Sequence, residues 1–263
     1  MNKAIAWLLA PLCAFFVIAA CTVARSKSLA VDGTRFVVDG PDGKVLRGAG
    51  LVGAELELGD GTTLRIDAVR VDPLDASGDT LLHLVSVRIG DGAWSNPCEA
   101  AADGTREAFP IPGRWDADGR YRADPDHFAL SCTSGAQAKC VRFGYKPWKQ
   151  ARDGSALAPI YESCVHMVRA DYCGDGIPAT RNGTLIDVFD DHDVQDSAKD
   201  PLLSFEAGWS PTGAVCVAHT RIAKELDLAA LVKRCPRLRE AVGETCDETS
   251  ARTLGALVFN ASR

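Results

Sequence analysis

Residues 164–176 read Cys-Val-His-Met-Val-Arg-Ala-Asp-Tyr-Cys-Gly-Asp-Gly, and within them the pattern changes from a helical period to a turn. In and just before this stretch, apolar residues recur three and four positions apart, at Ile160, Cys164, Met167 and Val168. That period predicts an amphipathic helix over residues 158–171, with Pro159 suited to its first turn. The glycines that follow predict a turn at 173–176.

The polar face of this helix carries side chains suited to acid–base chemistry. Glu162 and His166 are four positions apart and Arg169 follows by three, so the three can share one face opposite the apolar stripe. Glu162 could orient or charge His166 as a general base, with Asp171 or Glu206 assisting. The simpler interpretation is a solvated helix face. Asp171 lies just past the helix, where it is expected to brace the turn.

The cysteines predict disulfide bonds and therefore an exported protein. Eight follow residue 97, an even number that favours four bridges: Cys98, Cys132, Cys140, Cys164, Cys173, Cys216, Cys235 and Cys246. None is spaced Cys-x-x-Cys, so neither a thioredoxin-like motif nor a zinc ribbon is suggested. The sequence leaves the connectivity open, although Cys235 and Cys246 are expected to close a short local loop. Because no cysteine of this group precedes residue 98, the segment before it must fold by burial alone.

Residues 31–95 have the pattern of antiparallel β-structure. Asp-Gly dipeptides recur at roughly ten-residue intervals and separate short apolar stretches. Residues 56–58 and 64–68 alternate apolar and polar side chains around a glycine turn, which predicts a hairpin. Residues 81–89 predict a further strand, in which His83 is expected to be a packed or an edge residue rather than a ligand.

The rest of the chain predicts a mixture of strands and one more helix. Residues 96–130 are rich in Pro, Gly and Asp, which is typical of long loops. Strands are expected at 128–132, 139–145, 185–188, 203–206 and 214–218, and the second helix at 226–238. The predicted fold is therefore α+β and strand-rich, with an N-terminal antiparallel β segment at 31–95 followed by a disulfide-stabilised α+β domain at 96–263.

The N-terminus is typical of a secretory leader. Lys3 precedes an apolar run that is interrupted by Pro11 and is short for a membrane span. Residues 18–21, Ile-Ala-Ala-Cys, resemble the lipobox of bacterial lipoproteins, in which the cysteine becomes the first mature residue and its sulfur is acylated. This resemblance implies a signal peptide at 1–20, lipidation of Cys21 and a tether at 21–30, so the partner is a lipid bilayer. Thr22 resembles an outer-membrane sorting signal, and cleavage to a free secreted protein is the alternative.

Charge and composition exclude some classes of function. The chain has 29 Lys and Arg against 35 Asp and Glu, a formal net charge of -6, and no basic stripe, which argues against nucleic-acid binding. Residues 187–196 hold five acids but lack the alternating ligands and bend glycine of a calcium loop. A solvated acidic loop is expected there, and no cofactor or metal site is predicted.

Residues 170–173, Ala-Asp-Tyr-Cys, resemble in this setting the bacterial ADYC domain, a family named for that tetrapeptide. The similarity is expected to cover roughly residues 95–262. It implies an exported bacterial domain and assigns no activity. Together with Arg169, four amphipathic aromatics of the same region could line a binding groove, or the aromatics could pack over the disulfides: Tyr145, Trp148, Tyr172 and Trp209.

Neither nucleophile pattern in the chain is complete. Residues 163–167 superficially resemble the catalytic stretch of L,D-transpeptidases, but no glycine precedes Cys164 and its use would leave another cysteine unpaired. Residues 208–213 do not match the Gly-x-Ser-x-Gly elbow of serine hydrolases. We therefore expect a bacterial envelope lipoprotein that acts as a non-enzymatic binding or structural module. The alternative is a hydrolase or transpeptidase that acts on envelope polymers through His166.

Overall fold

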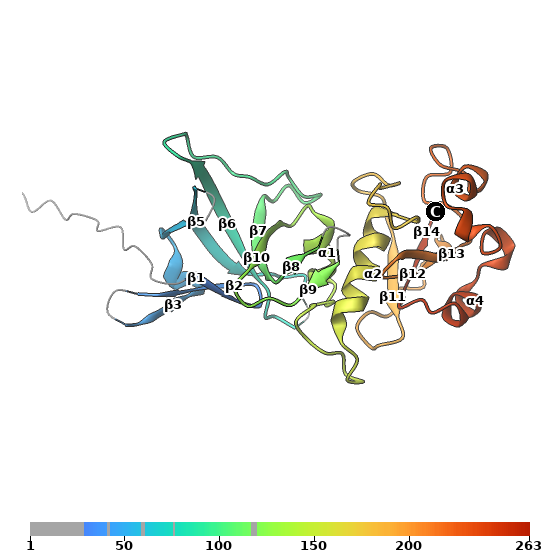
Figure 1. The fold of residues 1–263 in the computed structure, drawn as a ribbon, viewed down its shortest axis with the longest axis horizontal. Coiled ribbons are helices and arrows are strands. Elements are labelled where there is room, and N and C mark those ends of the chain that lie inside the picture. The colour runs from blue at the N-terminus through green and yellow to red at the C-terminus, as the bar shows by residue number, and fades with distance from the viewer. Residues whose placement is uncertain (1–28, 41–42, 59–60, 76, 117–119) are drawn as a thin grey trace, which may run out of the picture.

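A computed structural model describes residues 29–40, 43–58, 61–75, 77–116 and 120–263. The predicted signal peptide at 1–20 and Cys21 lie outside these residues, as does the predicted tether up to residue 28. The elements follow the chain along the long axis of the molecule, with the N-terminal strands at one end and the C-terminal strands and helices at the other (Figure 1). The structure confirms the α+β class and the antiparallel strands of the N-terminal part.

Three short strands open the described chain. They pair in the order β1-β2-β3 and lead into the 3-10 helix η1. Their bounds are β1 Leu29–Asp32, β2 Arg35–Asp39, β3 Val45–Arg47 and η1 Gly48–Leu51. Phe36 of β2 and Leu51 of η1 are buried in the same apolar cluster as the next sheet, so the two sheets share a core.

A five-stranded antiparallel sheet follows, in the order β10-β7-β6-β5-β4. Its strands are β4 Glu55–Glu57, β5 Thr62–Val71, β6 Leu81–Ile89, β7 Glu107–Pro112 and β10 Phe128–Cys132, and a hairpin of β8 Arg114–Trp115 and β9 Tyr121–Arg122 lies between the last two. The pairing of Leu56 with Leu64 confirms the predicted hairpin. Because β6 pairs with β7, the sheet crosses residue 95, where the cysteine distribution suggested a boundary.

His83 on β6 is fully buried, so it is a packed residue and not an edge residue. Its ring packs edge-on against Phe36, with 5.2 Å between the ring centroids. Burial lowers the pKa of His83 from 6.5 to about 4, so the folded protein holds this ring neutral.

Replacing His83 with leucine is expected to reduce the loss of stability in acid. Between the lowered folded pKa and the ordinary unfolded pKa, only the unfolded chain binds the proton, so stability falls as pH drops from about 6.5 towards 4. The shift corresponds to about 3 kcal/mol across that window. Urea unfolding at about pH 7, 5.5 and 4 measures the difference. His127→Leu, at an exposed position, is the control, and equal pH profiles for wild type and His83→Leu would contradict the prediction.

The C-terminal half packs helices against a four-stranded sheet of order β11-β14-β12-β13. Helix α2 (Leu157–Arg169) lies against β12, β13 and β14 and, on its other side, contacts α1 (Ala136–Arg142). The strands are β11 Asp187–Asp190, β12 Ser204–Ser210, β13 Gly213–Val217 and β14 Val258–Ser262, and the remaining helices are α3 Leu228–Arg234, η2 Pro236–Leu238, η3 Gly243–Thr245 and α4 Glu248–Thr253.

Two of the predicted elements differ in the structure. The strand predicted at 139–145 is wrong, because residues 136–142 form α1 instead. The alternation of Val141, Phe143 and Tyr145 favoured a strand, yet Ala138 and Val141 are buried at helical spacing. The second predicted helix ends early, at Arg234, because Pro236 opens a separate 3-10 turn.

All eight cysteines beyond residue 97 form disulfides, as their even number predicted. The pairs are Cys98–Cys132, Cys140–Cys164, Cys173–Cys235 and Cys216–Cys246. The predicted loop between Cys235 and Cys246 is wrong. Cys235 ends α3 beside the 173–176 turn, whereas Cys246 packs with Cys216 in the apolar cluster under α4. Four bridges are typical of a protein that folds in an oxidising, extracytoplasmic environment.

Candidate functional site

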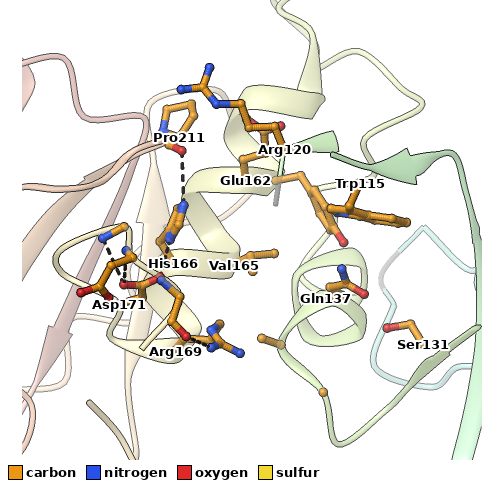
Figure 2. A pocket seen from close by; sticks show the side chains of 16 residues that line it. Trp115, Arg120, Ser131, Gln137, Glu162, Val165, His166, Arg169, Asp171 and Pro211 are labelled. Atoms are coloured by element: carbon orange, nitrogen blue, oxygen red, sulfur yellow. Dashed lines mark hydrogen bonds and ion pairs between the residues drawn. The ribbon is translucent and has the colours of Figure 1, made fainter. Parts of the chain in front are cut away.

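A cleft of about 720 Å³ opens along the polar face of α2. Its walls are α2 with the turn that follows it, the β8–β9 hairpin and the start of α1 (Figure 2). The lining residues are Trp115, Arg120, Ser131, Gly135, Ala136, Gln137, Tyr161, Glu162, Val165, His166, Arg169, Asp171, Gly174, Asp175, Gly176 and Pro211. Its volume lies within the roughly 300–1,000 Å³ typical of small-molecule sites.

Helix α2 forms the floor of the cleft, because its helical period buries one face and exposes the other. Ile160, Cys164 and Met167 are buried in the apolar core that α2 shares with the sheet and α1, which turns the opposite face outwards. The predicted shared face of Glu162, His166 and Arg169 is confirmed, since all three line the cleft. Tyr161 and Val165 lie on the same face. The helical period alone therefore also places Tyr161 on the face that lines the cleft, although it was not among the predicted site residues.

Both ring nitrogens of His166 lie within hydrogen-bonding distance of oxygen atoms on two neighbouring turns. Nδ1 lies 3.0 Å from Oδ2 of Asp171, and Nε2 lies 3.2 Å from the carbonyl oxygen of Pro211. A carboxylate and a carbonyl only accept, so a neutral ring can make one of these bonds and the doubly protonated ring makes both. In this arrangement neither nitrogen presents a lone pair to the cleft, which is what a general base needs.

Asp171 braces the turn after α2, as predicted, and it is also the partner of His166. Its buried carboxylate accepts the backbone N–H groups of Gly174, Asp175 and Gly176 at 2.9–3.1 Å. The chain reverses over the helix end because Ala170 adopts the left-handed conformation, with φ of 48°. Asp171, rather than Glu162, is therefore the hydrogen-bond partner of His166, and Glu162 instead accepts the backbone N–H of Tyr121.

The turn after α2 and the β12–β13 turn touch backbone to backbone, which requires glycine. Gly174 has φ of +71°, and a Cβ atom there would lie 2.2 Å from the carbonyl oxygen of Thr212. Gly213, opposite, has φ of +101°. This contact places Pro211 beside His166 and fixes that wall of the cleft.

Glu162 and the two arginines give the cleft charges of both signs. The backbone N–H of Tyr121 donates to Oε1 of Glu162 at 2.7 Å, and burial raises the pKa of this carboxyl above its ordinary value. Arg169 donates to the carbonyl oxygen of Gly176. Arg120 is exposed at the rim, and no hydrogen bond from its guanidinium is found within the described residues.

Among the residues that line the cleft, Tyr161 carries an unusual polar atom. The side chain is fully buried, and its hydroxyl has no hydrogen-bond partner within the described part of the chain. Burial is also the main cause that raises the pKa of Tyr161, so the group stays a neutral donor and acceptor. A buried polar atom without a partner costs about 1–3 kcal/mol, and such atoms are rare in folded proteins. The hydroxyl is therefore a candidate ligand contact.

Glu206 does not line the cleft. It is fully buried and paired with Arg221, and it also accepts hydrogen bonds from Tyr172 and Asn260. Because Tyr172, Arg221 and Asn260 are all buried, Glu206 is a structural carboxylate that lies apart from the His166 and Asp171 pair.

The candidate aromatics are mainly core residues. Tyr145, Tyr172 and Trp209 are buried, and the rings of the last two stack with 5.2 Å between centroids. Trp148 is half-buried and lies beside Gly33 in the β1–β2 turn. None of the four lines the cleft. They pack rather than form a groove, and only Arg169 of the proposed binding set reaches the cleft.

Both nucleophile patterns are occupied structurally. Cys164 is bonded to Cys140, and the hydroxyl of Ser210 donates to the carbonyl oxygen of Gly213. Among the described residues, no group of three His, Cys, Asp or Glu side chains could hold a metal ion. In the acidic segment, Asp190 accepts backbone N–H groups of its own turn and Asp187 accepts the hydroxyl of Ser197.

Six lining residues come from segments that precede α2 in the sequence: Trp115, Arg120, Ser131, Gly135, Ala136 and Gln137. No local sequence pattern predicts them, because the β8–β9 hairpin and α1 reach α2 only through tertiary packing. The short hairpin and the misassigned α1 gave no local signal for this approach.

Fold, bridges and cleft together define a disulfide-stabilised α+β protein of the kind made in oxidising compartments. The ADYC domain family model matches residues 48–223, more than half of the chain, so the protein belongs to the ADYC domain family. The match begins in the N-terminal β part and ends before α3. It therefore starts and ends earlier in the chain than the expected span of 95–262. No curated protein and no solved structure matches the chain.

Proposed function

We propose that this protein is a bacterial envelope lipoprotein, held on a bilayer by acyl chains on Cys21, that acts as a non-enzymatic binding module with the α2 cleft as its ligand site. One observation carries the proposal. In the cleft both ring nitrogens of His166 face protein oxygens at hydrogen-bonding distance, while the buried Tyr161 hydroxyl has no partner among the described residues. The polar groups of the cleft therefore suit hydrogen bonding to a ligand better than catalysis by His166.

The leader and the disulfides support export and anchoring. The lipobox-like residues 18–21 supply the acylation site, and the four bridges are stable only outside the reducing cytosol. No helix within the described residues is long and apolar enough to cross a membrane. Placement in the outer membrane follows from Thr22 as part of the same proposal.

Cys21→Ser is expected to abolish acylation. Cells grown with radiolabelled palmitate should label the wild type and leave Cys21→Ser unlabelled, because no other residue of the leader junction supplies the sulfur. Cys13→Ser, inside the leader, is the matched control and should keep the label. Label retained in Cys21→Ser, or a wild-type protein with an intact leader, would refute the anchor.

The binding function is tested with purified sacculi and the acylated protein in detergent micelles. We expect the protein to sediment with sacculi while releasing no soluble fragments. Failure to sediment would refute the binding module for this polymer.

A hydrolase or transpeptidase that uses His166 is the alternative, favoured by the His166–Asp171 pair at the cleft wall. Fragment release that is lost in His166→Gln would establish this enzyme instead. The Cys140–Cys164 bridge argues against Cys164 as its nucleophile.

A further inference from the structure

We infer that the α2 cleft binds a saccharide, with a pyranose ring against Trp115 and sugar hydroxyls hydrogen-bonded to Tyr161 and Glu162. This inference rests on the proposed function and names its ligand class.

The aromatic wall of the cleft suits a sugar ring. Trp115 lines the cleft from β8 and is held in place by Tyr121, edge-on at 5.6 Å between centroids. An indole face is electron-rich, so it attracts the slightly positive C–H bonds on the face of a pyranose. Stacking of the pyranose ring on Trp115 also buries apolar surface without requiring a hydrogen bond.

The polar groups of the cleft suit hydroxyls, which donate and accept at once. The Tyr161 hydroxyl is buried and unpartnered within the described residues. Ser131 is also buried at the cleft wall, and Gln137 lines the cleft from α1 (Figure 2). A ligand that supplied hydroxyls would remove the cost of the unpaired phenol, because each sugar hydroxyl can serve as its donor or acceptor.

The charges of the cleft are mixed rather than of one sign. Glu162 accepts one hydrogen bond from the backbone at Oε1, its Oε2 has no hydrogen-bond partner among the described residues, and Arg120 and Arg169 supply donors. A simple anion would be repelled by Glu162, and an apolar ligand would leave these groups desolvated without partners. The hydroxyl groups of a saccharide can donate hydrogen bonds to Glu162 and accept them from the two arginines, so they suit groups of both charges.

The test uses titration calorimetry on the acylated protein in detergent micelles. The probes are the peptidoglycan disaccharide without its stem peptide, the lipid-free core oligosaccharide of lipopolysaccharide, and the stem peptide alone. We expect saturable binding of at least one saccharide. Trp115→Ala should weaken it by about tenfold or more, and Tyr161→Phe by roughly three- to tenfold.

Matched controls separate the cleft from general effects. Trp94→Ala removes a half-buried tryptophan held between Arg65 and Arg88 outside the cleft, and it should leave the affinity unchanged. Tyr145→Phe removes a hydroxyl bonded to Asp190 and should also bind as the wild type does. If Trp115→Ala fails to fold by circular dichroism, Tyr161→Phe and the exposed Arg120→Ala decide.

The outcomes distinguish this inference from the proposed function. No binding of either saccharide, or binding that Trp115→Ala and Tyr161→Phe leave unchanged, would overturn the saccharide. Binding of the stem peptide alone, weakened by the cleft variants, would overturn the saccharide and keep the binding module. No binding of any probe or of sacculi would overturn both.

Discussion

Glu206→Leu is expected to lower the free energy of unfolding by about 3–5 kcal/mol, the cost of leaving one buried charge without its partner. Arg221 donates to Glu206 from Nε and Nη2, both at 3.0 Å, and both side chains are buried. The same guanidinium donates to the carbonyl oxygens of Met167 and Val168 at the end of α2. Losing the carboxylate therefore strands a buried cation and loosens the helix end above the cleft.

The network extends the effect of Glu206 to three further residues. Tyr172 donates its hydroxyl to Oε1 at 2.9 Å, and Asn260 of β14 donates to Oε2 at 2.7 Å. Trp209 in turn donates to the amide oxygen of Asn260 at 2.8 Å. Every member of the network has a partner, so removing its central acceptor leaves several donors unsatisfied at once.

Chemical denaturation measures this cost, and a double-mutant cycle assigns it to the pair. Glu206→Leu with Arg221→Leu should cost less than the sum of the single changes, since no charge is then left alone. Glu225→Leu, which breaks an exposed ion pair with Arg181, is the control and should cost under about 1 kcal/mol. A cost for Glu206→Leu no larger than that of Glu225→Leu would contradict the prediction.

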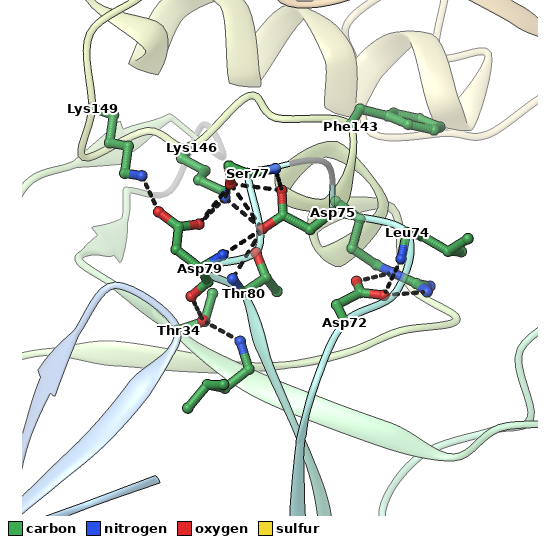
Figure 3. Close-up of polar contacts among 12 residues, drawn as sticks. Thr34, Asp72, Leu74, Asp75, Ser77, Asp79, Thr80, Phe143, Lys146 and Lys149 are labelled. Carbon is green, nitrogen blue, oxygen red and sulfur yellow. Dashed lines mark hydrogen bonds and ion pairs between the residues drawn. The ribbon is translucent and has the colours of Figure 1, made fainter.

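Lys146→Met is expected to lower the free energy of unfolding by about 3 kcal/mol or more, again by leaving buried charge unpaired. Lys146 follows α1, is 2% exposed, and donates to Asp75 at 2.9 Å, to Ser77 at 2.7 Å and to Asp79 (Figure 3). These three acceptors belong to the β5–β6 loop. One ammonium group therefore ties that loop to the helical half of the molecule.

The neighbouring lysine provides the control. Lys149 also pairs with Asp79 but is exposed, so Lys149→Met should cost under about 1 kcal/mol. Thermal unfolding of both variants beside the wild type measures the difference. Equal shifts in the two variants would show that burial of Lys146 contributes nothing.

The same cluster also affects the stability of the protein in acid. Burial alone would raise the pKa of Asp79, but hydrogen bonds from Lys146 and Lys149 lower it below its ordinary value of 3.8. The stabilising contribution of Asp79 is therefore complete above that value and is lost as pH falls below it. His83 acts in a higher window, between about 6.5 and 4.

The helix period and the cysteine count predicted much of the fold, because both are local or additive signals. The strand at 81–89, the hairpin around residue 60 and the helix over 158–171 agree closely with β6, β4–β5 and α2. Helix α1 was missed because its sequence alternates like a strand, and the bond from Cys140 to Cys164 on α2 accompanies its helical packing.

For the site, the sequence predicted one wall and missed the other. Glu162, His166 and Arg169 were placed on a common face by spacing alone. Asp171 was expected only to assist His166 and not to be its hydrogen-bond partner, because the chain reverses at Ala170, and a left-handed alanine is uncommon. Trp115 is supplied by a hairpin whose approach to α2 is set by tertiary packing, which no local pattern records.

Two of the bridges overlap along the chain, since Cys216 lies between Cys173 and Cys235 and is joined to Cys246 beyond them. Cysteines emerge from an export channel in sequence order, so an oxidant that joined each newcomer to its predecessor would form the first two native pairs and then two wrong ones. Reaching the native pattern requires thiol–disulfide exchange. The yield of this protein is thus expected to depend on an isomerase that reshuffles mispaired thiols, and a strain lacking one should accumulate a mispaired form.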